Sequence, residues 1–366
     1  MNDRERMLTF LKGEVPDRVP WFGDLTYWAG ARENDGDLPE GFGSSDEYYD
    51  FHRDLGVGFY LQGYQPSIGS LDDTITAEGD RTGVRIEHTV NTPVGSLTQI
   101  QQALPDSATV ACLKHYVDGP EDLAALRWWF EHTEFSANYS EAVKRQGLVE
   151  DLGVVLCYLP KSPFMQMMVV YAGVETVIDL WMDVRDEFEA TLAVMEAKVA
   201  EDAQICVDSP AECLMIPENL SSEVVGKNFY ESYVRSYHER WTDAIRSAGK
   251  TSFIHVDGTV EGLGAEVAQS GFDVIEAVTP KPVGDISLQQ MRDLVGEKTI
   301  LWGGLPGIYF TPHVSDEEFE SYTRQTLELM RQTPNYVLGV ADQVPPDGTR
   351  ERIARVVELA KESGRY

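Results

Sequence analysis

The sequence predicts a (β/α)8 barrel of the TIM type. From about residue 150 to the end of the chain, apolar segments of strand length alternate with longer segments of helical periodicity. Such alternation indicates parallel strands joined by right-handed helical crossovers. Two earlier apolar segments, residues 18–22 and 58–63, bring the number of expected strands to eight, which is the number that closes a TIM barrel.

The first part of the chain supplies the first two strands and an excursion. Residues 3–12 are typical of a short helix closed by Gly13, and the second strand is expected over 56–64. Between residues 65 and 120 apolar and polar side chains alternate, with a predicted hairpin at "NTPVG" (91–95), and a helix is expected from about 119. We therefore predict one barrel domain over residues 1–366, with an insertion at about 65–150, after the second strand, packed on the barrel.

The remaining strands follow in regular order. The six apolar segments are 153–160, 212–219, 251–258, 272–280, 298–306 and 335–345. The helical segments quoted between and after them include 174–202, 226–250, 288–296, 316–332 and 349–364.

Composition narrows the class of partner. The chain has 61 acidic and 30 basic residues, a formal net charge of −31, which argues against nucleic acid and anionic membranes as partners. Four cysteines without a CxxC pair suit a reducing compartment. The charged start resembles no signal peptide, and no apolar run is long enough to span a membrane, so a cytoplasmic protein is expected. Self-association stays open.

Ionisable residues gather at the expected carboxyl ends of the strands, where TIM barrels carry their chemistry. His255 and Asp257 share one face of a strand because side chains alternate along it. The ionisable candidates are Asp24, Glu218, His255, Asp257, Glu276 and Asp342, and the candidates for contact with substrate are Asp24, Asn219, Tyr64, Tyr158 and Trp302. Each aromatic residue of this set could instead belong to the barrel core, and Glu218 could instead accept bonds from the following loop.

Several motifs resemble the uroporphyrinogen decarboxylase superfamily. They are "RERMLTFLKGEVPDRVP", "NTPVGSLT", "HVDG" at 255–258, "GFDVIEAVTPKPVGDISLQQMRDLVGEKTILWGG" and "VADQVPPDGTRERI". The resemblance spans essentially the whole chain and implies a TIM-like barrel. It also implies one of two activities: decarboxylation of a porphyrinogen, or methyl transfer to or from a corrinoid held on a separate protein.

The methyltransferase branch is the closer match. The decarboxylases carry an arginine-rich segment early in the chain, whereas here Arg32 stands alone. The coenzyme M methyltransferases bind zinc through His-x-Cys and a later Cys. Those positions match His255, Asp257 and Asp342, so the resemblance implies a metal site, with zinc expected and harder cations open.

The departure from thiolates favours a direction for the reaction. An oxygen-rich site is a harder Lewis acid, suited to a leaving oxygen or a similar group. We expect methyl transfer from a small substrate, such as an aryl methyl ether or a methylated amine, to the cobalt of a corrinoid protein. Glu218, His255 and Glu276 are the expected catalytic residues, with Glu218 as a fourth ligand or general acid and Glu276 as partner of His255 or of the ligand.

Two other functions remain open. One is a metal-free decarboxylase or lyase that uses Asp24, Glu218 and His255 as acid and base groups. The other is a non-catalytic member that binds a small molecule or a corrinoid protein.

Overall fold

The barrel is present, and it belongs to one of two compact units. The computed structural model describes residues 1–61, 64–71, 73–80, 83–104 and 109–366. One unit, which we call the barrel unit, contains residues 1–64, 140–158 and 210–366. The other, the second unit, contains residues 65–139 and 159–209.

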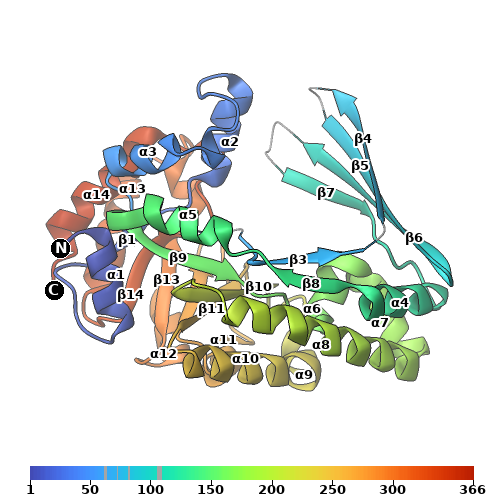
Figure 1. Ribbon diagram of the computed structural model, residues 1–366. Helices are drawn as coiled ribbons and strands as arrows, with labels where there is room; N and C mark the ends of the chain where they lie inside the picture. The colour runs from blue at the N-terminus through green and yellow to red at the C-terminus, as the bar shows by residue number, and fades with distance from the viewer. Residues whose placement is uncertain (62–63, 72, 81–82, 105–108) are drawn as a thin grey trace. The chain divides into compact units, whose positions relative to one another are not determined.

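Eight parallel strands form the sheet of the barrel unit (Figure 1). Their order around the sheet is the order along the chain, and a parallel bridge between Phe22 and Gly58 joins the first strand to the second. The predicted (β/α)8 barrel is therefore confirmed. The strands are β1 (Trp21–Phe22), β2 (Phe59–Leu61), β9 (Gly153–Tyr158), β10 (Cys213–Leu220), β11 (Thr251–Val256), β12 (Val274–Val278), β13 (Ile300–Leu305) and β14 (Tyr336–Val340).

One helix of the barrel unit precedes the first strand, and the others connect the strands or follow the last one. The expected first helix is α1, and its capping box joins Asn2 and Glu5. The helices of this unit are α1 (Asp3–Leu11), α2 (Thr26–Asp35), η1 (Phe42–Ser44), α3 (Glu47–Leu55), α5 (Ser140–Val149), η4 (Glu150–Leu152), α9 (Gly226–Phe229), η6 (Tyr230–Val234), α10 (Arg235–Ser247), α11 (Gly264–Gln269), α12 (Leu288–Val295), η7 (Gly307–Phe310), α13 (Asp316–Met330) and α14 (Arg350–Ser363).

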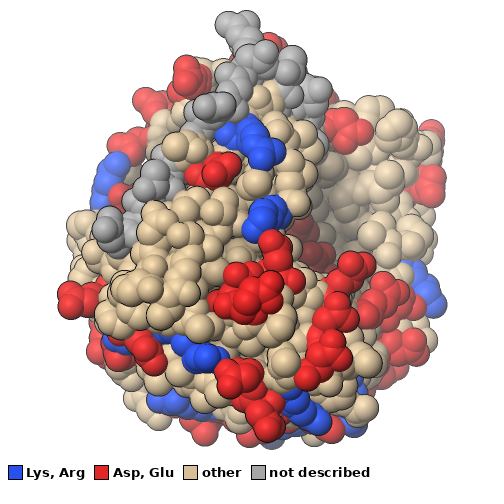
Figure 2. Space-filling model, turned by 90° about the vertical axis from the view of Figure 1, so that its right-hand side faces the viewer, with Lys and Arg blue, Asp and Glu red and all other residues tan. Residues whose placement is uncertain are grey.

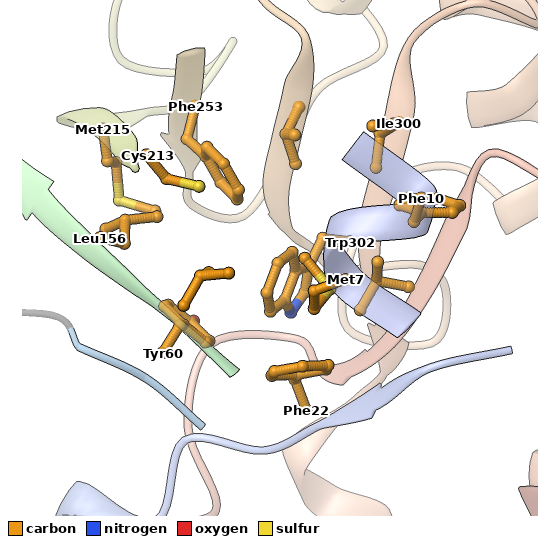
Figure 3. Close-up of a cluster of buried hydrophobic side chains, with 13 residues drawn as sticks. Met7, Phe10, Phe22, Tyr60, Leu156, Cys213, Met215, Phe253, Ile300 and Trp302 are labelled. Carbon is orange, nitrogen blue, oxygen red and sulfur yellow. The ribbon is translucent and has the colours of Figure 1, made fainter. Parts of the chain in front are cut away.

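The barrel is filled by a cluster of buried apolar side chains. Trp302 of β13 lies at its centre, with Phe22 and Tyr60 to one side and Met7 of α1 to the other (Figure 3). The ring of Trp302 meets those of Tyr60 and Phe22 edge-on, at centroid distances of 4.6 and 5.2 Å. Because the interior is packed, only the ends of the barrel are free for chemistry.

The second unit consists of two antiparallel sheets and a set of helices. The four-stranded sheet runs in the order β4-β5-β6-β7, and the expected hairpin is the pairing of Thr92 with Gly95 at its turn. That the insertion packs on the barrel stays a prediction. The elements are β3 (Ser67–Ser70), β4 (Asp73–Asp80), β5 (Gly83–Thr92), β6 (Gly95–Leu104), β7 (Thr109–Lys114), η3 (Pro120–Asp122), α4 (Leu123–His132), β8 (Glu134–Ala137), α6 (Pro163–Gln166), η5 (Met167–Tyr171), α7 (Gly173–Asp183) and α8 (Arg185–Val207).

The charge of the surface agrees with the composition. Acidic side chains cover more of the face shown in Figure 2 than basic ones do. Within the described part of the chain, no helix is both long and apolar enough to cross a membrane.

Candidate active site

His255 and Glu276 form the centre of the candidate site. They are paired residues on the neighbouring strands β11 and β12. Phe253 and Val274, two residues earlier on each strand, point into the barrel core, so His255 and Glu276 also point inward, one layer nearer the carboxyl end. The imidazole Nδ1 lies 2.6 Å from Glu276 Oε2. Glu276 is thus the hydrogen-bond partner of His255, which is one of the two roles expected for it.

Tyr60 of β2 completes the support of Glu276. Its hydroxyl donates to Glu276 Oε1 at 2.9 Å, and both side chains are buried. Burial and the carboxylate charge raise the pKa of Tyr60 well above its usual value, so the phenol keeps its proton. Each oxygen of Glu276 therefore has a hydrogen-bond partner.

The protonation of His255 follows from these neighbours. Burial by itself would lower the pKa of the imidazole, but the charge and hydrogen bond of Glu276, together with the charges of Asp342 and Asp257, outweigh burial, and the pKa lies above its usual value. Nδ1 carries a proton toward Glu276, while Nε2 is directed to Asp342, whose Oδ1 lies 4.0 Å away. The nitrogen that faces the mouth of the barrel is therefore Nε2.

Two further carboxyl groups have pKa values raised toward neutral pH. Asp342 follows β14 with a φ of 99°, and burial raises its pKa to about 6 although His255 opposes the rise. Asp24 follows β1 and is 8 % exposed; burial raises its pKa to about 7, hydrogen bonds from Thr26 oppose the rise, and the charges of Asp342 and Glu276 add to it. At neutral pH both groups can hold or release a proton.

A cavity of about 310 Å³ adjoins these groups within the barrel unit. Asp24 and Tyr60 line it, and the rest of its wall comes from the segments around β1, η1, α3, β2 and α5. Because Tyr60 also holds Glu276, the cavity and the His255 pair share one residue.

Glu218 does not join this group, and its expected place at the mouth is corrected by the structure. The side chain is fully buried and its Oε1 lies 2.9 Å from Nε2 of His238 on α10, which is also fully buried. Because this partner belongs to α10, the Glu218 carboxylate lies against the helices and not among the groups around His255. The catalytic role expected for Glu218 stays a prediction.

The other candidates are placed as follows. Trp302 belongs to the packed core and not to a substrate surface. Asn219 is exposed, with a φ of 55°, and Asp257 is exposed just beyond β11. Tyr64 lines the cavity, and Tyr158 is partly buried against the core.

Three residues that the sequence did not single out lie at the site. Tyr60 holds Glu276. Burial raises the pKa of Tyr27, and the negative charges of Asp342, Asp24 and Asp257 raise it further. His52 lines the cavity. Tyr60 lies in the apolar run 58–63 that predicted the second strand, and a hydroxyl on such an apolar run could have indicated it.

The donor set fits a metal ion in type but not in spacing. A histidine whose Nδ1 is held by a carboxylate, with Nε2 directed outward, is the usual arrangement of a metal ligand. Nε2 and Asp342 Oδ1 are 4.0 Å apart, however, further than two ligands of one tetrahedral ion at bond lengths of about 2 Å. Among the residues that the structure describes, no three His, Cys, Asp or Glu side chains form a group that could hold a metal ion.

Fold and site together define a (β/α)8-barrel protein with an imidazole among buried acids at its carboxyl-terminal mouth. The family model for uroporphyrinogen decarboxylase (URO-D) matches residues 113–363. The chain belongs to this family. Asp24, His52 and Tyr60 lie outside the matched residues.

Comparison with solved structures supports the fold. A methyltransferase from Methanosarcina mazei matches with a TM-score of 0.64 and 14% sequence identity, covering 99% of each chain. An FMN-binding beta-glucuronidase from Facaelibacterium prausnitzii L2-6 matches with a TM-score of only 0.29 and 9% identity, over 79% of this chain and 58% of that chain. No curated protein sequence matches this chain.

Proposed function

We propose that this protein is a methyltransferase that takes a methyl group from a small methylated substrate and passes it to the cobalt of a corrinoid protein. The observation that carries the proposal is the His255–Glu276 pair at the barrel mouth, at the position where the resembling methyltransferases have their histidine. The likeness in fold to the Methanosarcina mazei methyltransferase over nearly the whole chain is in keeping with it.

The charges at the site disfavour the other activity of the family. A porphyrinogen carries several carboxylates, which cationic side chains would have to bind. The group formed by Asp24, Glu276 and Asp342 is acidic instead. Arg32 does not supply the missing charge, because its guanidinium donates to the Pro346 carbonyl at 2.8 Å and faces Asp35 and Asp37.

Within this proposal each residue has a role that follows from its contacts. Glu276 and Tyr60 fix the orientation of the imidazole, so that Nε2 faces the reacting groups. Asp24 and Asp342, with pKa values of about 7 and 6, can accept or return a proton near neutral pH. The packed layer around Trp302 closes the barrel below them.

Zinc at this site remains part of the proposal. His255, Asp342 and Asp257 would hold the ion, which would supply Lewis acidity when bound. In the structure His255 Nε2 and Asp342 Oδ1 are 4.0 Å apart, so both side chains would have to move closer to bind one ion. Elemental analysis of protein purified without chelator tests this part: about one equivalent of metal that His255→Ala and Asp342→Ala both lower supports it, and metal below about 0.1 equivalent contradicts it.

Methyl transfer itself has a direct assay. The protein is mixed with a reduced corrinoid protein from the same genome and a panel of methyl donors, and methylcobalamin is followed by its absorbance. We expect formation that depends on one class of donor and is lost in His255→Ala, while the exposed control His313→Ala keeps it. If no donor in the panel methylates a properly reduced corrinoid protein, the proposal is wrong.

A metal-free lyase is the second candidate, favoured by one observation. Asp24 and Asp342 both titrate near neutrality within one cluster, which is suited to general acid–base chemistry. Release of carbon dioxide from a small carboxylic acid by metal-free protein, without any corrinoid protein, would support this function over the first.

A further inference from the structure

We propose that the cavity beside Asp24 binds the methyl donor as a small methylated ammonium ion, with the Asp24 carboxylate as its counter-ion. This inference rests on the proposed methyl transfer and names the substrate class, which that proposal leaves between ethers and amines.

Three buried polar atoms in the cavity wall have no hydrogen-bond partner among the described residues: the Tyr48 hydroxyl, which can donate or accept, and the two acceptors Asp24 Oδ2 and His52 Nε2. Asp24 Oδ1 accepts the Thr26 amide at 2.8 Å, but Oδ2 has no hydrogen-bond partner among the described residues. His52 is fully buried; its Nδ1 faces the Val57 carbonyl at 3.3 Å and must donate to it, which leaves Nε2 as an acceptor, also without a partner in the described chain. A ligand that satisfies both acceptors brings donors or positive charge.

The wall of the cavity also suits a cation. The aromatic side chains that line it are Tyr48, Phe59, Tyr60 and Tyr64. Aromatic faces beside a carboxylate attract methylated ammonium ions through the ring quadrupole. A volume of about 310 Å³ is at the low end of ligand cavities, so the ligand is small.

The one arginine of the cavity is not available to bind an anion. Arg145 Nε pairs with Glu141, Nη1 donates to the Tyr49 hydroxyl at 2.7 Å, and Nη2 donates to the Ser44 carbonyl at 3.3 Å. Its charge is therefore neutralised by Glu141. Asp24 remains as the acidic group of the wall without a cationic partner, and the nearby acids Glu276 and Asp342 make the field more negative.

The chemistry of an ammonium donor balances without help at the leaving group. The methyl carbon forms its new bond with the electron pair of the reduced cobalt(I) of the partner protein. The C–N pair stays on nitrogen, and a neutral amine leaves. Neither a proton nor a Lewis acid is needed at the nitrogen, because the ammonium ion already carries the positive charge that the departing neutral amine loses.

Calorimetry on the full chain without any corrinoid protein tests the ligand class. We expect trimethylammonium chloride to bind, and the neutral molecules tert-butanol, of similar shape, and 2-methoxyphenol, an aryl methyl ether, to bind at least about tenfold more weakly. Asp24→Asn should weaken trimethylammonium binding about 10- to 100-fold, because the amide keeps the bond from Thr26 but loses the charge. The control Asp35→Asn removes a carboxylate from the exposed end of α2 and should change nothing.

Binding and methyl transfer can fail separately. If tert-butanol or 2-methoxyphenol binds as well as trimethylammonium, or if no trimethylammonium binds at millimolar concentration, the inference is overturned whatever the methyl-transfer assay gives. The comparison of ligands needs only the wild type, so it stands even if a variant does not fold. If trimethylammonium binds through Asp24 but no donor methylates cobalt, the ligand class stands and the proposed function falls.

Discussion

Asp24 is the residue whose environment is most at odds with its charge. Its pKa of about 7, against an ordinary 3.8, means that the native state binds its proton more tightly than the unfolded state does. The stability gained from the neutral form is fully present below pH 4 and is lost as the pH rises through 7. At pH 8 the penalty for keeping the carboxylate buried is on the order of 4 kcal/mol.

We therefore predict that Asp24→Asn stabilises the protein, and more so at high pH. The amide retains the acceptor for Thr26, so the difference in free energy of unfolding should be near zero at pH 4 and reach a few kcal/mol at pH 8. Urea unfolding of both proteins from pH 4 to 8 measures it, with Asp35→Asn as an exposed control. A difference that does not change with pH would show that Asp24 has an ordinary pKa.

The buried pair of Glu218 and His238 gives a second prediction at the residue scale. His238→Ala leaves a fully buried carboxylate without its imidazole, which should cost about 3–5 kcal/mol. The matched control is His313→Ala, whose ring is 75% exposed and 3.6 Å from Asp347; its cost should be below about 1 kcal/mol. Equal losses in denaturant unfolding would mean that the buried pair contributes no more than a surface pair.

At the scale of elements, the packing of β14 against β13 fixes the floor of the site. Gly339 of β14 leaves room for Trp302: a Cβ at this position would lie 2.8 Å from the indole Cδ1. Trp302 in turn contacts Tyr60, which holds Glu276. A methyl group added at Gly339 therefore pushes on the side chains that orient His255.

Gly339→Ala should destabilise the barrel by about 1–3 kcal/mol through this overpacking, and should also lower activity. Gly147 of α5 offers the opposite case, because a Cβ there meets nothing within 4 Å. Gly147→Ala should stabilise the protein by about 0.5–1 kcal/mol and leave activity unchanged. Thermal unfolding and an activity assay of both variants test these predictions. A Gly339→Ala variant with unchanged stability and activity would show that Trp302 can move to make room for the methyl group.

The positions of the strands were predictable from the sequence, but the direction in which individual side chains point was not. The positions of the eight strands and of the hairpin at 91–95 followed from apolar runs and turn residues, except that residues 62–63 of the predicted second strand lie outside the described residues. The barrel strands are apolar on both faces, as parallel strands are. The sequence therefore could not tell which of Pro217 and Glu218 points inward, and Glu218 proved to face α10.

On the scale of the whole molecule, charge is the dominant feature. With 61 acidic and 30 basic residues, repulsion between carboxylates opposes the compact state. Salt screens this repulsion, since the Debye length falls from about 30 Å at 0.01 M to about 10 Å at 0.1 M.

We predict that the melting temperature rises as sodium chloride increases from 0.01 to about 0.5 M. Potassium chloride should act equally, because screening does not depend on which cation is present. A melting temperature that falls with salt would mean that the surface ion pairs, such as Arg355 with Glu320, stabilise more than the net charge destabilises.

The sequence by itself determined the barrel, the order of its strands and the place of His255, Asp24 and Asp342 at their carboxyl ends. These follow from local periodicity and from the rule that parallel strands present one end together. Only the tertiary structure decided that Tyr60 holds Glu276, that Glu218 turns away, and that Asp24 and His52 line one cavity. The reason is that these contacts join residues from strands and helices far apart in the chain. Which side chains meet there depends on how the strands close and on which face of each turns inward, and two-sided apolar strands do not record that face.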